Sequence, residues 1–568
     1  MQEKSGTVSA ARAAEEKAAC GAAETVGKTS ETLKKTAETV GRTAETAVKT
    51  AETVSKTDVS ENGKGSAPAA AERAAGVLLH ISSLPGKYGI GTLGREARRF
   101  ADFLHAAGVR YWQVLPLVQT GYGDSPYQSV FGASGNPYLI DIEELFRLGL
   151  IHRAEMKALA GKKGVDYGML YRKKYALLRT AFSRFDRNDP AFCAFVEEGS
   201  FHEYALFMAL KTAHGGASFD RWKRSYRFRE GGALDSFLLR ERDEYLFWQF
   251  VQFTFFRQWK ALKAYINGLG IRVIGDLPLY VAYDSADVWA QPQLFKLTGS
   301  RKPRKVAGVP PDYFSATGQL WGNPVYDWAQ HKETGYEWWI ERMHRAFQMY
   351  DVVRIDHFRG LDRYYEIDAG EETAVNGKWH RGPGMALFRA AKEKLGSLPL
   401  IAEDLGAMDA GVEKLLRTSG FPGMKVLQFA FDGDPNNAYL PQNIGKNSVA
   451  YTGTHDNDTM VGYLRSLSRA ELERVSGIVR EQLRRRQLAG CGGGVYGVAR
   501  AIRLLCWQSD AQLAVVPMQD LLQLGSEARM NTPAVSEGNW RFRPEALPTA
   551  RLQEVLREEL MAFGRAGK

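Results

Sequence analysis

Short apolar runs recur along the chain from Ala75 onward, and helix-like stretches separate them. Runs of this length and composition are typical of buried β-strands. Eight strands alternating with helices predict an α/β fold, a (β/α)8 barrel of the TIM type. The predicted strands cover residues 76–84, 111–116, 271–281, 351–358, 398–405, 424–431, 448–456 and 513–519.

The spacing of the runs is irregular, which predicts insertions in the barrel. Residues from about 145 to 270 are rich in aromatic and charged residues at helical spacing, so they predict an inserted, mainly helical subdomain. The second long gap, at about 284–350, contains 308–315, whose glycine and prolines predict an ordered, exposed loop near the barrel mouth. No strand-rich segment follows the eighth run, so no C-terminal β-sandwich domain is expected.

The N-terminal segment has a different pattern. Residues 23–57 are five heptads of the type Ala-Glu-Thr-Val-Gly-Lys-Thr, with small or apolar residues at the first and mostly the fourth position. That spacing is typical of a coiled-coil seam, but alanine, glycine and threonine make the seam thin and lower helix propensity. Two hypotheses stay open, a disordered tail and a weak self-association helix. The predicted division is a tail with linker over 1–70 and a catalytic barrel over 71–568.

Composition narrows the possible partners and compartments. The net charge is +10, but the basic residues form separate short runs without a nucleic-acid motif, so no nucleic-acid partner is expected. No apolar run reaches the roughly 20 residues of a membrane span, and no secretory apolar core stands at the N-terminus. The four cysteines are scattered without a metal-site or disulfide pattern. The sequence therefore predicts a cytoplasmic protein without a membrane partner.

Three carboxylates follow apolar runs and are the candidate catalytic residues: Asp356, Glu403 and Asp456. Parallel-barrel enzymes carry their chemistry where the strands end. Two carboxyl groups that flank a glycosidic bond can cleave it, and a third can stabilise the sugar as it becomes cationic. The pattern therefore indicates glycosidic-bond chemistry.

Each of these residues also has a simpler interpretation. Arg354 and Asp356 share one side of a strand, so the pair fits either an oriented nucleophile or a structural ion pair. Glu403 ends a very apolar run, where desolvation would raise its pKa, although a helix-capping acid is the alternative. The sequence His455-Asp456-Asn457-Asp458 lacks a matching ligand set nearby, so no metal is expected. No cofactor is expected either, because no phosphate-binding glycine loop is convincing.

Longer motifs occur around these residues in one fixed order. They cover 121–128, 275–280, 306–315, 320–324, 354–358, 402–406, 451–459 and 529–533, for example Gly-Tyr-Gly-Asp-Ser-Pro-Tyr-Gln at 121–128. The set closely resembles the 4-alpha-glucanotransferases, or amylomaltases, of glycoside hydrolase family 77, which are relatives of the alpha-amylases. The resemblance covers roughly residues 75–542 and excludes the heptads.

The resemblance implies roles for individual residues. Asp356 matches the family's nucleophile, Glu403 its acid/base and Asp456 its transition-state stabiliser. A retaining double displacement would place Asp356 and Glu403 roughly 5–5.5 Å apart. The flexible loop over the acceptor side matches Tyr313 and Phe314. Other positions implied in binding maltooligosaccharides and alpha-1,4-glucans are Tyr122, Tyr127, Asp276, Arg354, His357, His455 and Asn531.

Two departures from the family pattern and two rival functions stay open. Residues 301–305 (Arg-Lys-Pro-Arg-Lys) are more basic than usual, and Gln442 stands where a histidine is common. An alpha-glucan hydrolase with the same three acids is the main rival, because no residue type fixes the preference for sugar over water as acceptor. A catalytically silent glucan-binding protein is the second rival, although such a protein has no need of a buried acid at Glu403.

Overall fold

The computed structural model describes residues 73–121, 123–161, 164–311, 315–406, 408–490, 492–535 and 537–567. The heptads and the linker after them lie outside this range. The coiled-coil hypothesis and the domain division near residue 70 therefore stay predictions. No helix in the described part of the chain is long and apolar enough to cross a membrane.

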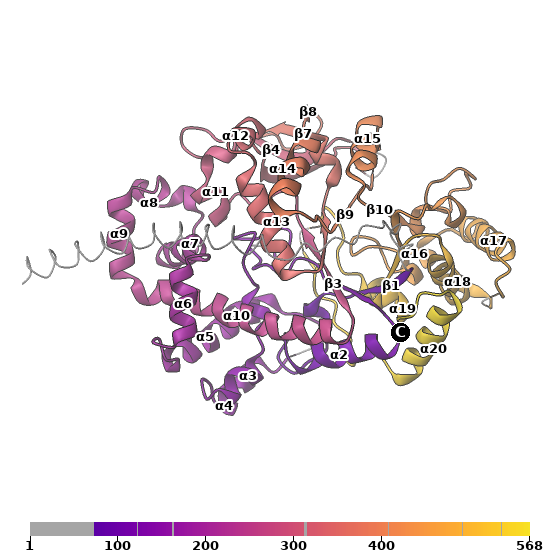
Figure 1. The fold of residues 1–568 in the computed structure, drawn as a ribbon, viewed down its shortest axis with the longest axis horizontal. Coiled ribbons are helices and arrows are strands. Elements are labelled where there is room, and N and C mark those ends of the chain that lie inside the picture. Colours follow the sequence, from indigo (N-terminus) through magenta and orange to yellow (C-terminus); the bar gives the residue numbers. More distant parts are fainter. Residues whose placement is uncertain are drawn as a thin grey trace, which may run out of the picture. The chain divides into compact units, whose positions relative to one another are not determined.

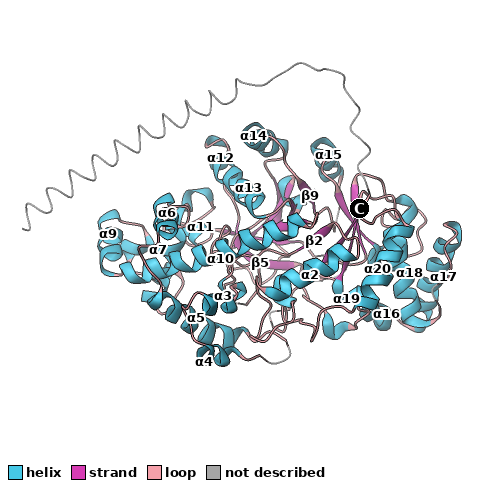
Figure 2. Cartoon of the chain, turned by 60° about the horizontal axis from the view of Figure 1, so that its bottom comes forward, coloured by secondary structure: helices cyan, strands magenta, loops and turns pink. Residues whose placement is uncertain are grey.

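Eight parallel strands close into a barrel in the order β1-β12-β11-β10-β9-β6-β3-β2, which confirms the predicted fold. Each predicted apolar run overlaps one of these strands. Figure 2 shows the strands inside a layer of helices. The strands are β1 (Ala74–Leu78), β2 (Tyr111–Gln113), β3 (Arg272–Leu277), β6 (Val352–Ile355), β9 (Leu400–Ala402), β10 (Gly423–Val426), β11 (Ser448–Tyr451) and β12 (Leu513–Pro517).

Most residues on both faces of the barrel strands are buried, which explains why the strands are mainly apolar. In β12, Leu513 and Val515 belong to a cluster that also contains Ile274 and Met424 from other strands. The alternate residues of β12, such as Val516, pack into the large core that includes the surrounding helices. Side chains of a strand alternate between its two faces, so one apolar run contributes to two packing layers.

Helices fill the interval between β2 and β3. The longest, α10 (Arg242–Gly268), contacts α5, α6, α7 and α9 on one side and α2 (Arg95–Ala106) and β3 on the other. In Figure 1 it runs from the group of inserted helices toward the barrel. Its buried aromatic residues, such as Phe250 and Trp259, belong to one core that is continuous between the inserted helices and the barrel. The other helices are α3 (Ile142–Arg147), α4 (Arg153–Met156), α5 (Tyr167–Arg184), α6 (Pro190–Glu198), α7 (His202–Ala213), α8 (Arg224–Arg227) and α9 (Gly231–Arg240).

The expectation of a loop over 308–315 is wrong for its first part. Residues Gly308 and Val309 end strand β4 (Lys305–Val309), which pairs with β5 (Gln319–Pro324) in an antiparallel sheet. A Cβ at Gly308 would lie 2.2 Å from the carbonyl oxygen of Gln319, so the glycine permits the strands to approach closely. The sheet continues through β7 (Arg363–Asp368) and β8 (Lys378–Arg381).

The remaining helices cover the barrel and its C-terminal end. No strand follows β12 within 518–535 and 537–567. Between β3 and β12 lie α11 (Ala286–Ala290), α12 (Trp328–Glu333), α13 (Glu337–Met349), α14 (Met385–Leu395), α15 (Ala410–Ser419), α16 (Met460–Ser466), α17 (Arg469–Arg485) and α18 (Gly494–Gln508), and after it α19 (Met518–Leu521) and α20 (Ala550–Ala562).

Candidate active site

The candidate acids gather at one end of the barrel because the parallel strands all finish there. Backbone bonds fix their relative positions: the Asp356 N–H donates to Leu277 O at 3.1 Å, and the Glu403 N–H donates to Ile355 O at 3.1 Å. The register also pairs Asp276 of β3 with Arg354 of β6. Strand register therefore brings together side chains that are far apart in sequence.

Arg354 connects three of the acids. Its Nη1 lies 2.7 Å from Asp276 Oδ2 and 3.0 Å from Asp356 Oδ1, and its Nη2 lies 3.9 Å from Glu403 Oε2. The guanidinium side chain is only 4% exposed. Burial opposes its charge, but the surrounding carboxylates outweigh burial and raise the pKa of Arg354. The arginine thus holds a permanent positive charge among the acids and orients Asp356.

Glu403 lies directly after β9 and is largely buried, with 13% of its side chain exposed. Its Oε2 accepts a hydrogen bond from the His357 N–H at 2.6 Å, and its Oε1 accepts one from the Leu405 N–H at 3.3 Å. Burial raises the pKa of Glu403 to about 8, against the effect of Arg354 and with support from Asp356. The group is therefore suited to carry a proton near neutral pH.

Tyr127 links the acids to an aromatic wall. Its hydroxyl donates to Asp276 Oδ2 at 2.8 Å, and its ring stacks on His455 with centroids 5.2 Å apart. Trp540 lies against both rings, at 5.8 Å from Tyr127 and 5.7 Å from His455. Burial raises the pKa of Asp276 to about 7, although Arg354 opposes the shift, and burial lowers the pKa of His455.

Asp456 is the most exposed of the three predicted catalytic acids, with 43% of its side chain accessible. Its Oδ1 accepts a hydrogen bond from Asn531 Nδ2 at 2.6 Å and lies 3.3 Å from His455 Nε2. Arg529 Nη2 donates to the backbone oxygen of Asp456 at 2.6 Å. The carboxylate is therefore held by neighbours on one side and open on the other, where a ligand can approach it.

His357 follows the acid Asp356 in a strained backbone conformation, with φ of 49°. Burial lowers the pKa of His357 to about 4, so the ring is neutral. Its Nε2 is buried without a hydrogen-bond partner among the described residues. The rings of His357 and Trp321 are nearly perpendicular, with centroids 4.9 Å apart. A buried nitrogen without a protein partner beside the acids is suited to bind a sugar hydroxyl.

Three predicted binding residues, Tyr122, Tyr313 and Phe314, lie outside the described residues. The structure adds contacts that the sequence did not single out. Arg529 belongs to a motif that already contains Asn531, so proximity in sequence was a usable signal. Trp540 lacks any such signal because its ring meets Tyr127 and His455 only in the folded chain.

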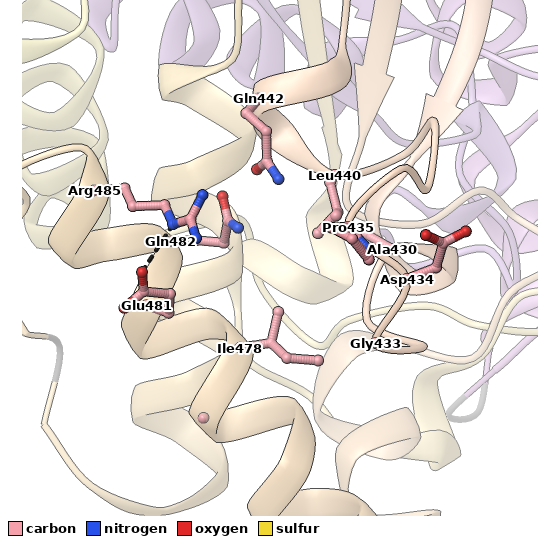
Figure 3. Close-up of a pocket in the computed structure, with 11 residues that line it drawn as sticks. Ala430, Gly433, Asp434, Pro435, Leu440, Gln442, Ile478, Glu481, Gln482 and Arg485 are labelled. Atoms are coloured by element: carbon pink, nitrogen blue, oxygen red, sulfur yellow. Dashed lines mark hydrogen bonds and ion pairs between the residues drawn. The ribbon is translucent and has the colours of Figure 1, made fainter.

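A pocket of about 320 Å³ lies apart from the acid cluster, between α17 and the segment that follows β10 (Figure 3). Gln442, the departure from the family pattern, lines it together with Leu440, Ile478 and Gln482, and none of the predicted catalytic acids does. Gln442 therefore lines a different part of the surface from the predicted catalytic acids. Among the described residues, no group of three or more His, Cys, Asp or Glu side chains is arranged to hold a metal ion.

Comparison with known proteins identifies the family. The sequence profile of glycoside hydrolase family 77, described as 4-alpha-glucanotransferase, matches residues 79–548. The chain belongs to this family. A 4-alpha-glucanotransferase of Thermus thermophilus is 49% identical over 483 residues, which cover 83% of this chain and 94% of the relative. One from Clostridium butyricum is 44% identical over 472 residues, covering 82% of this chain and 95% of the relative.

Solved structures agree with the family assignment. The amylomaltase from Streptococcus agalactiae in complex with acarbose superimposes with a TM-score of 0.82 at 38% identity, covering 87% of this chain and all of that one. The amylomaltase from Corynebacterium glutamicum, at 18% identity and a TM-score of 0.70, shares the fold. The family 77 chain therefore has 4-alpha-glucanotransferase activity, and the comparisons lend no support to the rival hydrolase or silent binding protein.

We expect Tyr127→Phe to lower kcat/KM on maltotriose by about tenfold, the equivalent of about 1.4 kcal/mol. The substitution removes the hydrogen bond to Asp276 and leaves the ring on His455. Steady-state kinetics on the purified variant measure the effect. Tyr496→Phe, which loses the contact with Arg465 far from this wall, is the matched control and should stay at the wild-type rate. A Tyr127→Phe rate equal to that of the control would contradict the role of the hydroxyl.

Proposed function

We propose that the family 77 chain transfers alpha-1,4-glucan segments by a retaining double displacement in which Asp356 is the nucleophile and Glu403 the acid/base. The observation that carries the proposal is the unequal environment of the two carboxyls around Arg354. Asp356 lies 3.0 Å from the guanidinium, which favours the charged form that a nucleophile needs. Glu403 is more remote from it and buried, which favours the protonated form that an acid needs.

In the first step Glu403 gives its proton to the glycosidic oxygen while Asp356 attacks the anomeric carbon. The bond from that carbon to the departing oxygen breaks, and a covalent bond from the carbon to an Asp356 oxygen forms. The leaving oxygen takes the proton from Glu403, so the departing glucan leaves with a free 4-hydroxyl. Glu403 is left ionised.

In the second step Glu403 acts as a base on the 4-hydroxyl of an acceptor glucose or maltooligosaccharide. The acceptor oxygen attacks the anomeric carbon, and the bond to Asp356 breaks. Two inversions at one carbon retain the alpha configuration. Water in place of the acceptor would give hydrolysis, so transfer depends on keeping sugar at that position.

Asp456 stabilises the cationic sugar between the two steps, because its open carboxylate carries negative charge into the site. The sugar ring at the cleavage point would be held by Tyr127, Asp276, Arg354, His357, His455 and Asn531. We also propose that Tyr122 binds substrate and that the pair Tyr313 and Phe314 covers the acceptor side. Aromatic side chains there would stack on an acceptor sugar and displace water.

Incubation with maltotriose followed by separation of the products tests transfer against hydrolysis. Transfer gives glucose plus a ladder of longer chains, whereas hydrolysis gives only short products. Proton NMR of the newly formed glycosidic bond tests retention, since the longer products must contain only alpha-1,4 linkages. A beta linkage in a transfer product would contradict the double displacement.

We expect kcat/KM for maltotriose to fall at alkaline pH as Glu403 loses its proton. The donor step needs the acid form, and burial raises the pKa of Glu403 to about 8, so the rate is sustained below that pH and declines above it. The pH profile of kcat/KM measures the midpoint. The same profile with alpha-maltosyl fluoride is the control, because fluoride leaves without protonation and the decline should be absent. A decline with the same midpoint for both donors would assign it to another group.

The N-terminal segment is proposed to be dispensable for chemistry and to act, if at all, in self-association through its heptads. We expect a chain that begins at Ala70 to transfer maltotriose at the wild-type rate, because the candidate acids and their partners all lie between residues 127 and 540. Kinetics and light scattering on the two forms measure rate and association. A large fall in turnover for a truncated chain that keeps its circular dichroism spectrum would show that the segment contributes to the site.

The scattered cysteines support a cytoplasmic location for the enzyme.

A further inference from the structure

Three guanidinium groups surround one phenyl ring on the helical side of the molecule. The arginine cluster is Arg224, Arg227 and Arg301. Their guanidinium carbons lie 4.7, 4.8 and 5.1 Å from the centre of the Phe228 ring. Arg224 and Arg227 belong to α8, whereas Arg301 comes from the basic run that precedes β4. Two segments distant in sequence therefore contribute to one concentration of positive charge.

Backbone carbonyl groups hold two of the three arginines in place. Arg301 donates from Nη1 to Arg227 O at 2.7 Å and from Nη2 to Phe228 O at 3.3 Å. Arg227 Nη1 donates to Asp220 O at 3.1 Å. Carbonyl oxygens orient these two guanidinium groups without cancelling their charge. Arg227 and Arg301 are therefore preorganised, which lowers the entropy cost of binding a ligand.

The positive charge of the cluster is poorly compensated. Within the described part of the chain, no carboxylate forms an ion pair with Arg227 or Arg301, and Arg224 has only Glu230 at 3.9 Å, with both side chains exposed. The ring distances put any two guanidinium carbons within about 10 Å, close to the screening length at physiological salt. Burial lowers the pKa of Arg301, and the charges of Arg229 and Arg227 lower it further.

Neighbouring side chains add to the excess or are already paired. Lys302 and Arg304 are exposed, and neither forms an ion pair with a described carboxylate. Arg229 is already paired, because Glu203 accepts two hydrogen bonds from it at 2.7 Å. An anion placed at the cluster would relieve repulsion that the chain itself leaves in place.

We propose that the arginine cluster binds the phosphate group of a phosphate monoester carried by a sugar or a glucan chain. Guanidinium groups present forked donors that match phosphate oxygens, and a phosphate monoester near neutral pH brings close to two negative charges and three acceptor oxygens. A neutral sugar offers no charge to the cluster. This site goes beyond the transfer reaction and does not depend on the roles of Asp356 and Glu403.

Calorimetric titration of the full-length enzyme tests the proposal. The probes are glucose 6-phosphate, a phosphorylated maltooligosaccharide, inorganic phosphate and neutral maltotriose. Arg224→Gln/Arg227→Gln is the cluster variant. The matched control is Arg469→Gln/Arg551→Gln, which removes the same charge from side chains that are 93% and 75% exposed elsewhere.

We expect saturable binding of the phosphorylated probes to wild type and control, and about tenfold weaker binding to the cluster variant. Binding should weaken as salt is added. Preferential binding of the phosphorylated maltooligosaccharide would identify a glucan chain as the carrier of the phosphate, whereas preferential binding of glucose 6-phosphate would identify a single sugar. Binding of inorganic phosphate as tight as that of the sugar esters would overturn the proposed ester in favour of the free anion. Transfer on neutral maltotriose should stay within about twofold for all three proteins, which separates this test from that of the catalytic roles.

A second variant keeps the test valid if the first variant does not fold. Lys302→Gln/Arg304→Gln changes only exposed side chains. It should also weaken binding of the phosphorylated probes relative to the control variant. Equal phosphate affinity in control and both charge variants would overturn the proposal, as would the lack of saturable binding to wild type. A short single-stranded DNA that binds the cluster more tightly than the phosphorylated glucan would overturn it in favour of a nucleic-acid site.

Discussion

Replacement of Asp356 by alanine is expected to lower kcat on maltotriose by about four orders of magnitude or more. In the proposed mechanism an oxygen of this carboxylate forms the covalent bond to the anomeric carbon. Asp276 is not expected to take its place, because its Oδ2 is already bound by Arg354 Nη1 at 2.7 Å. Initial-rate measurement at saturating maltotriose gives the loss directly.

The control for this substitution is Asp235→Ala, an exposed acid on α9 that forms no ion pair among the described residues. It should keep the wild-type rate. Circular dichroism and thermal melting should show that Asp356→Ala still folds. Activity of Asp356→Ala within about tenfold of wild type would remove it from the role of nucleophile.

Replacement of Glu403 by glutamine is expected to cause a loss of similar size on maltotriose but a much smaller one on alpha-maltosyl fluoride. Glutamine keeps the side-chain oxygen that accepts from the His357 N–H, yet it has no proton to give to a glycosidic oxygen. Fluoride leaves without that proton, so formation of the covalent intermediate should survive. Release of fluoride, followed with an ion-selective electrode, measures this step by itself.

The contrast between the two substrates distinguishes an acid/base from a group that only shapes the site. Asp356→Ala should lose activity on maltotriose and on alpha-maltosyl fluoride to the same extent, because the proposed mechanism needs the nucleophile for both donors. Glu413→Gln, an exposed acid on α15, is the matched control and should affect neither. Equal loss on both donors for Glu403→Gln would contradict proton donation as its role.

The barrel follows from the sequence because each of its strands is buried on both faces. Such strands are mainly apolar, and helical spacing separates them along the chain. The apolar run at 513–519 therefore predicts β12 without reference to any other part of the chain. The acids Asp356 and Glu403 could be singled out for the same local reason, since each follows such a run. Their catalytic roles rest on the family resemblance and stay predictions.

Other features depend on contacts between distant segments, which local patterns do not encode. The β4–β5 pair forms where glycine lets two backbones approach, and the sequence around Gly308 looks like a loop because its prolines disrupt regular structure just beyond. Trp540 contacts Tyr127 and His455 only in the folded chain, because these residues are far apart in sequence.

The sequence by itself determined which segments form the barrel strands and which acids follow them. A run of consecutive apolar residues indicates both that a strand is buried and roughly how long it is. Only the tertiary structure decided how those acids interact. Arg354 meets Asp276, Asp356 and Glu403 through the register of neighbouring strands, and the burial that raises the pKa of Glu403 comes from the surrounding fold. Distances and desolvation are properties of the assembled barrel, since they depend on residues that are adjacent in space and remote in sequence.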